Sequence, residues 1–147
     1  MLRDFRTVVA VGHVIELAVA PVFLLTAVGT LLSVMTNRLA RIIDRARFHE
    51  SKLENAQPDQ VATIRSYLLV LSRRADLIGH AIFLCTSTAL LVCTVIALLF
   101  LGDYLRYDVS LPIASLFILG MLLLVLGLIC FLREVFIAKG SLHIGPH

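Results

Sequence analysis

The sequence lacks the residue patterns that mark an enzyme active site. No nucleophile stands with a base and an acid in a recognisable arrangement, no glycine-rich loop is placed to hold a phosphate, and no HExxH motif occurs. We therefore expect a protein that is not an enzyme and that carries no cofactor.

Cysteine is scarce, with three residues in the chain: Cys85, Cys93 and Cys130. Their number is odd, no CxxC pair occurs, and each lies inside an apolar run without neighbouring metal-ligating side chains. This pattern argues against a disulfide framework and against a metal site. We interpret the three as small apolar packing residues, because free cysteine behaves in this way in protein cores.

Charged residues are also few, at 16% of the chain, and the net charge is only +3. The basic residues cluster beside apolar runs, where lipid head groups account for them, so we expect no nucleic-acid partner. Apolar residues, in contrast, make up 59% of the chain, whereas soluble domains hold roughly 45–50%. This composition indicates a membrane protein, with residues 1–147 forming a single membrane domain.

Three apolar runs are long enough to cross a bilayer, which takes about 20 residues in a helix. They cover residues 14–36, 81–101 and 109–132. Because backbone groups in hydrocarbon must be satisfied within the segment, we expect each run to be a helix. The first run carries an A-x-A sequence at 18–20 but is too long for a signal peptide, so we expect a retained span. The sequence thus predicts an all-α integral membrane fold with three transmembrane helices.

Lysine and arginine residues set the expected orientation of the chain. The segment 37–76 is rich in them, whereas the short loop 102–108 holds only Arg106. With that loop and the N-terminus outside, ten basic residues lie inside and three outside. We therefore predict an external N-terminus and a cytoplasmic C-terminus, although the two arginines of the N-terminal tail count slightly against this orientation.

The basic segment keeps the helical spacing of apolar residues beyond the membrane edge. We expect the first helix to continue to about Glu54, with a turn at 55–59 and Pro58 at a first helical position. The next helix carries a narrow apolar seam at offsets of 0, 3, 7 and 10, namely Val61, Ile64, Leu68 and Leu71. The first two helices are thus predicted to extend as a cytoplasmic antiparallel hairpin over 37–76, with their seams facing each other or a neighbouring subunit.

Glu16 is an unusual residue, because a carboxylate within a span is costly and often functional. His13 lies about one turn before it on the same helix face. Pro21 has no N–H, which leaves the carbonyl of Leu17 without its helical partner. His13, Glu16 and Pro21 therefore form a candidate ion or proton site. The alternative is that Glu16, about one turn into the bilayer, stays hydrated near the outer interface.

Three arginines share one helix face just after the first span: Arg38, Arg41 and Arg45, at offsets of 0, 3 and 7. Asp44 lies three residues after Arg41 and three before Arg47, close enough to pair with either. Guanidinium groups at the membrane edge match lipid phosphates well. In a ring of subunits the same arginine stripe would line a cytoplasmic vestibule and favour anions. The third interpretation is that these arginines only fix the topology, with their side chains snorkelling toward water.

Small residues recur at an interval of seven in two spans, as Ala20 and Ala27 in the first and Gly120 and Gly127 in the third. Such residues let membrane helices approach closely, so we expect these positions to meet each other or another subunit. Three helices bury few of their own faces, and we therefore predict a homo-oligomer. A polar patch at 85–88 is expected to bond to the preceding helical turn or across to another helix.

Several stretches of the chain resemble a family of bacterial membrane proteins known as domain of unknown function 2721. They are HVIELAVAPVFLL at 13–25, NRLARIIDRAR at 37–47, RRADLIGHAI at 73–82 and FLREVFIA at 131–138. The resemblance covers about 13–138, and the arginine-rich motif is its specific part. It implies a small three-span protein of the bacterial inner (plasma) membrane, and it supplies no activity.

The resemblance also implies a shared site that includes Arg133 and Glu134. In the predicted topology these two residues lie at the cytoplasmic end of the third span, level with the arginine stripe. Glu134 would then neutralise part of the stripe, and Asp44 or Asp76 would complete a charge network at the inner membrane surface.

Three functions are consistent with these features. The leading hypothesis is a homo-oligomeric channel-like or transport-related assembly, with Glu16 near an outer entrance and the arginine stripe around an inner vestibule. The second is a structural or regulatory membrane protein whose hairpin binds a cytoplasmic partner. The third is a protein that binds anionic membrane lipid through the arginine stripe.

Overall fold

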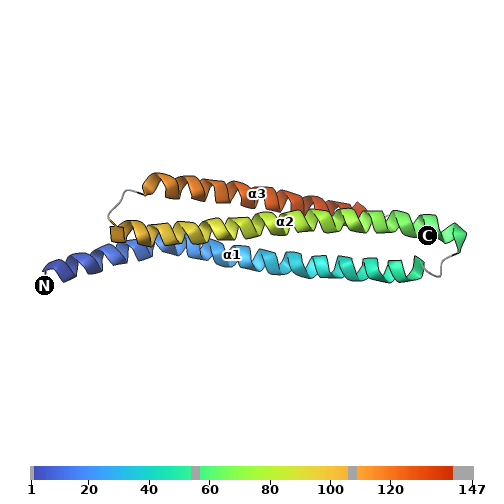
Figure 1. Ribbon diagram of the computed structural model, residues 1–147, viewed down its shortest axis with the longest axis horizontal. Helices are drawn as coiled ribbons and strands as arrows, with labels where there is room; N and C mark the ends of the chain where they lie inside the picture. The colour runs from blue at the N-terminus through green and yellow to red at the C-terminus, as the bar shows by residue number, and fades with distance from the viewer. Residues whose placement is uncertain (1, 54–56, 106–108, 141–147) are drawn as a thin grey trace. The chain divides into compact units, whose positions relative to one another are not determined.

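In a computed structural model, the protein is described over residues 2–53, 57–105 and 109–140, which are almost entirely helical and contain no strand. The helices are α1 (Leu2–Leu53), α2 (Pro58–Leu105) and α3 (Ser110–Gly140). Figure 1 draws each of them as one continuous ribbon. The all-α prediction is confirmed.

The helices are longer than the apolar runs that predicted them. Helix α1 begins at Leu2, well before the first run, and continues through Pro21 without a break. Helix α2 begins at Pro58, where the fixed backbone angle and missing N–H of proline suit the first helical position. The predicted turn at 55–59 and the predicted loop at 102–108 lie partly outside the described residues, because 54–56 and 106–108 are not among them.

Within the described residues, three helical segments are long and apolar enough to cross a membrane: Gly12–Leu53, Pro58–Gly102 and Ser110–Gly140. In the most apolar stretch of each segment, only 17%, 22% and 11% of the residues are buried inside the chain. Large side chains such as Phe23 and Phe83 are mostly exposed. Exposing this much apolar surface to water is unfavourable, whereas lipid tails accept it. The chain is therefore a multi-pass membrane protein.

By its internal contacts the chain divides into two compact units, and each unit contains parts of all three helices. The first unit comprises Met1–Leu31 and Cys85–Val125. The second unit comprises Leu32–Leu84 and Leu126–His147.

In the first unit, α2 and α3 approach each other closely. The buried Thr88 hydroxyl, from the predicted polar patch, donates a hydrogen bond across to the carbonyl of Gly120 at 3.1 Å. A Cβ atom on Gly120 would lie 3.7 Å from the Cβ of Leu91, which is ordinary van der Waals contact. A Cβ atom on Gly102, in contrast, would overlap the side chain of Val109. Glycine at 102 is therefore what allows the residue before α3 to pack against the end of α2.

The core of the second unit is formed by apolar side chains that are almost completely buried. Met35 and Ile42 come from α1, and Leu71 and Ile78 come from α2. Further along the same two helices, the rings of His49 and Tyr67 lie with their centroids 4.6 Å apart. Within this unit, α1 and α2 therefore lie side by side (Figure 1).

Candidate functional site

The most distinctive polar residue of the second unit is Glu134 in α3, whose side chain is 0% exposed. Its Oε1 accepts hydrogen bonds from Nε and Nη2 of Arg74, at 3.1 and 2.8 Å. Its Oε2 accepts a third bond from Nη1 of Arg38, at 3.1 Å. Hydrogen bonds between charged groups are roughly twice as strong as neutral ones. Both carboxylate oxygens are thus satisfied, as a buried charge requires.

These three residues come from three different helices: Arg38 from α1, Arg74 from α2 and Glu134 from α3. The guanidinium of Arg38 also lies over the ring of Phe131, with its central carbon 5.3 Å from the centroid. Phe131 precedes Glu134 by three residues, so both side chains lie on one face of α3. A cation over an aromatic face is attracted by the ring quadrupole. One face of α3 therefore supplies both a carboxylate and an aromatic ring to Arg38.

A hollow of about 230 Å³ lies beside this buried carboxylate. Its lining contains four arginines and one acidic residue, which give it a formal charge of +3. Arg41 and Arg45 are exposed, and neither pairs with a carboxylate among the described residues. We call this site the electropositive hollow; its lining residues are Arg38, Arg41, Ile42, Arg45, Arg74, Glu134 and Ala138.

The structure brings together part of the predicted charge network. All three arginines of the stripe line the electropositive hollow, and one of them, Arg38, contacts Glu134. Asp44, Asp76 and Arg133 are exposed. The ion pairs that Glu134 makes with described residues do not include these three.

Arg74 is the residue of this site that was not predicted from the sequence, because it entered there only within the basic segment 37–76 and within the family-like stretch 73–82. It lies three residues after Leu71 and four before Ile78, and both of these side chains are buried. Helical spacing therefore places Arg74 close to the inward face of α2. Extending the predicted apolar seam beyond Leu71 would have identified Arg74 as a candidate partner for a buried carboxylate.

The candidate ion or proton site at the start of α1 belongs to the first unit. His13 and Glu16 are exposed, whereas Pro21 is buried. The apolar neighbours Ile15 and Leu17 are also about half exposed, at 52% and 50%. Within one chain, the carboxylate of Glu16 thus lies on an open apolar surface.

The small residues of the spans fall into two groups. Gly120 and Gly127 in α3 are buried, and the carbonyl of Gly120 accepts the hydrogen bond from Thr88 of α2. Ala20 and Ala27 in α1 are exposed. The positions in α3 are therefore occupied within the chain, while those in α1 remain available to another molecule.

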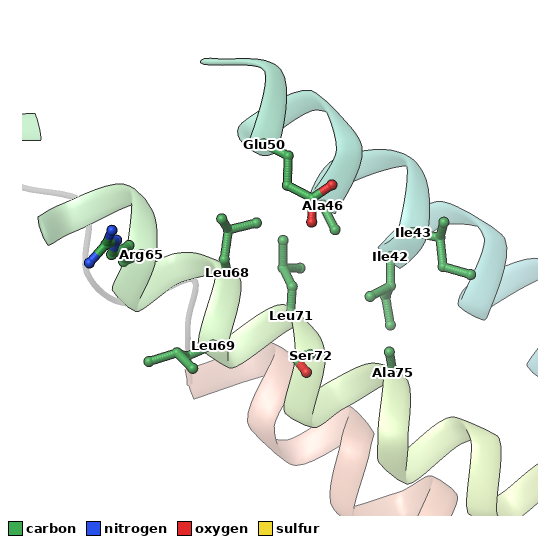
Figure 2. A pocket seen from close by; sticks show the side chains of 10 residues that line it. All are labelled: Ile42, Ile43, Ala46, Glu50, Arg65, Leu68, Leu69, Leu71, Ser72 and Ala75. Atoms are coloured by element: carbon green, nitrogen blue, oxygen red, sulfur yellow. The ribbon is translucent and has the colours of Figure 1, made fainter. Parts of the chain in front are cut away.

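A second hollow, of about 400 Å³, lies between α1 and α2 in the second unit. Figure 2 shows Ile42 from α1 facing Leu71 and Ala75 from α2. Leu68, also from the predicted seam, lines the same space. This arrangement favours the interpretation that the seam faces α1 of the same chain.

The cysteines of the described residues are all free: Cys85 is buried, Cys93 is exposed and Cys130 is half-buried. No group of three or more histidine, cysteine, aspartate or glutamate side chains that could hold a metal ion occurs in the described part of the chain.

Comparison with known proteins identifies the family of the chain. No curated protein and no solved structure matches it. The sequence profile of the family described as "Protein of unknown function (DUF2721)" matches residues 18–144. This range includes every residue that lines the electropositive hollow, whereas His13 and Glu16 precede it. The resemblance seen in the arginine-rich motif is confirmed, and the chain belongs to the DUF2721 family.

Proposed function

We propose that this protein binds a phosphate-bearing anion at the cytoplasmic surface of the bacterial inner membrane. The observation that carries the proposal is the arrangement of guanidinium groups in the electropositive hollow. Arg41 and Arg45, without carboxylate partners, line the same space as two arginines held by the buried Glu134. The planar guanidinium presents paired N–H groups that match phosphate oxygens.

Glu134 contributes to binding by fixing part of the site in advance. It holds Arg38 and Arg74 through three hydrogen bonds. Because these side chains are already ordered, less conformational entropy is lost when a ligand binds. The single carboxylate leaves an excess of positive charge, which attracts an anion into the hollow.

The location at the inner membrane surface follows from the distribution of basic residues. The arginine stripe begins immediately after the first apolar run, which ends at Thr36. The positive-inside rule predicts that this basic segment is cytoplasmic and that the N-terminus is outside, so the helical hairpin predicted over 37–76 would lie in the cytoplasm. Anionic lipid head groups are the phosphates nearest to arginines in this position.

Lipid analysis of the purified protein tests this proposal. We expect the natural chain to retain anionic lipid through purification in a neutral detergent. The double variant Arg41→Ala with Arg45→Ala should lose that lipid, because both unpaired guanidinium groups are removed. Arg47→Ala is the matched control, since Arg47 is exposed and does not line the hollow. Equal amounts of anionic lipid on all three proteins would contradict the proposal.

A homo-oligomeric, channel-like or transport-related assembly is the second candidate function. The observation that favours it is the exposed Glu16 on an apolar stretch of α1, beside the exposed Ala20. A charged residue facing hydrocarbon at the middle of a span costs roughly 2.5–3.5 kcal/mol, and less near the interface. Packing α1 against a second copy would cover the carboxylate, and alanine at 20 permits a close approach.

Two measurements on reconstituted protein test this second candidate. Crosslinking should trap an assembly larger than one chain, and proteoliposomes should pass protons or ions faster than empty liposomes. Glu16→Gln should reduce the flux, whereas Glu50→Gln, at an exposed position in another part of α1, should not. A monomer with no flux above the empty liposomes would eliminate this candidate.

A further inference from the structure

Among its described residues, the lining of the electropositive hollow offers many hydrogen-bond donors and one side-chain acceptor, the carboxylate of Glu134, which is fully buried. Arg38, Arg41 and Arg45 come from α1, Arg74 from α2, and the carboxylate of Glu134 from α3. Oε1 of that carboxylate is taken by Arg74 and Oε2 by Arg38. The side chains of Ile42 and Ala138, which complete the lining, are apolar. A head group that ends in an ammonium, such as ethanolamine or serine, would find no exposed carboxylate here.

The lining has enough guanidinium N–H groups to donate hydrogen bonds to all three terminal oxygens of a phosphate. Each guanidinium carries five N–H groups, and Arg38 uses only one of them on Glu134. The guanidinium groups of Arg41 and Arg45 are without carboxylate partners. A phosphodiester presents two terminal oxygens and one negative charge. A phosphomonoester presents three such oxygens and approaches two charges above its second pKa, near 6.

The volume of the hollow also favours a compact phosphate group. Pockets for drug-sized ligands usually enclose about 300–1,000 Å³, and this hollow encloses about 230 Å³. It suits a compact anionic group better than a phosphate with a bulky second substituent. The formal charge of +3 likewise balances a dianion more completely than a monoanion.

We infer that the electropositive hollow selects a phosphomonoester over a phosphodiester. This inference rests on the proposed function and specifies its ligand class. The phosphomonoester is either the head group of a lipid of the phosphatidic acid type or a soluble phosphomonoester from the cytoplasm. In both cases the recognised chemistry is a terminal phosphate dianion held by Arg41, Arg45 and the free N–H groups of Arg38.

Calorimetric titration of the full-length protein in a neutral detergent tests the selection. The probes are dihexanoyl phosphatidic acid, dihexanoyl phosphatidylglycerol with the same acyl chains, and glycerol 3-phosphate. An additional hydrogen bond to a charged group is worth roughly tenfold in affinity. We expect phosphatidic acid to bind at least about tenfold more tightly than phosphatidylglycerol at pH 7.5. This ratio should shrink toward one at pH 5, where the monoester carries a single charge.

Single variants locate the binding to the hollow. Arg41→Gln and Arg45→Gln should each weaken phosphatidic acid binding by about tenfold. Arg47→Gln, on the same helix but outside the hollow, should leave the affinity unchanged. Equal loss in all three variants would mean that the anion is attracted by the basic segment in general, and would overturn the inference.

The outcomes separate this inference from the proposed function. Equal affinity for phosphatidic acid and phosphatidylglycerol, both weakened by Arg41→Gln, would overturn the selection and leave phosphate binding in place. Binding of neither lipid nor glycerol 3-phosphate would overturn both. If selection is observed, tighter binding of phosphatidic acid than of glycerol 3-phosphate assigns the ligand to the lipid. Equal binding of these two probes would assign it to the soluble phosphomonoester, and either assignment supports the inference.

Discussion

Glu134 is the residue on which the electropositive hollow depends, because it is fully buried between two arginines. A buried carboxylate contributes little net stability when it is paired, since the loss of hydration offsets the attraction. Removing it, however, leaves two guanidinium groups without a counter-charge. Arg74 is only 13% exposed and would be affected most, whereas Arg38 is 41% exposed and can turn toward solvent.

We predict that Glu134→Gln lowers the stability of the folded protein by roughly 2–5 kcal/mol, mainly through the unpaired Arg74. Thermal unfolding in detergent, followed by circular dichroism, would show the decrease. Glu50→Gln makes the same chemical change at an exposed position in the second unit and should alter the midpoint little. Equal midpoints for the two variants would show that the ion pairs do not stabilise the fold.

Two buried glycines in the first unit should respond differently to alanine. Gly120→Ala adds a Cβ at ordinary contact distance from Leu91 and should be nearly neutral. Gly102→Ala would overlap Val109 and should cost about 1–3 kcal/mol, the usual range for overpacking. The unfolding midpoints of the two variants provide the comparison. A larger loss for Gly120→Ala than for Gly102→Ala would be inconsistent with this packing of α2 and α3.

At the scale of the helices, α2 contributes to both the apolar core and the ion pairs of the second unit. Its side chains Leu71 and Ile78 belong to the apolar core shared with α1, and Arg74 between them reaches Glu134 in α3. The apolar contacts and the ion pair thus lie on adjacent faces of one helix. Loss of the contact between α1 and α2 would consequently disturb the arginines that both helices supply to the hollow.

Leu71→Ala tests the contribution of this contact between helices. Leu71 is 2% exposed, and truncating a buried leucine costs roughly 2–5 kcal/mol. Leu69→Ala makes the same change two residues away, where the side chain is 71% exposed, and should cost less than about 0.5 kcal/mol. The two midpoints in a thermal unfolding experiment give the result. Equal effects would mean that the seam does not pack on α1.

At the scale of the whole molecule, the proposed function depends on which side of the membrane holds the hollow. The helices themselves are long and apolar enough to span a bilayer in either direction. The predicted orientation comes from the basic residues of 37–76, which the positive-inside rule places in the cytoplasm. An external hollow would face different phosphates, so orientation decides which ligands are accessible.

Cysteine labelling determines this orientation. In a variant without native cysteines, Gln60→Cys and Tyr104→Cys introduce thiols at exposed positions next to opposite ends of α2. We expect an impermeant maleimide to label Tyr104→Cys on intact spheroplasts and to label Gln60→Cys only after permeabilisation. The reverse pattern would place the electropositive hollow on the outer side of the membrane.

The amino-acid sequence by itself determined the membrane class and the helical elements. Long apolar runs and backbone groups that must bond within their own segment leave helices as the expected structure for spans. The start of α2 at Pro58 and the continuation of α1 beyond Thr36 could also be predicted from the sequence, because proline geometry and residue spacing act locally. The arginine stripe was identified for the same reason.

Which charged side chains form ion pairs was determined only by the tertiary structure. Arg38 is 96 residues from Glu134 in sequence, and Arg74 is 60 residues away. Helical periodicity places a side chain on a face of its own helix, but it does not say which face of a second helix lies opposite. Packing of the three helices in the second unit brings Arg74 to the buried carboxylate and leaves Arg41 and Arg45 exposed in the hollow. The pairing of charges depends on contacts between distant segments, and those contacts exist only after the helices have packed.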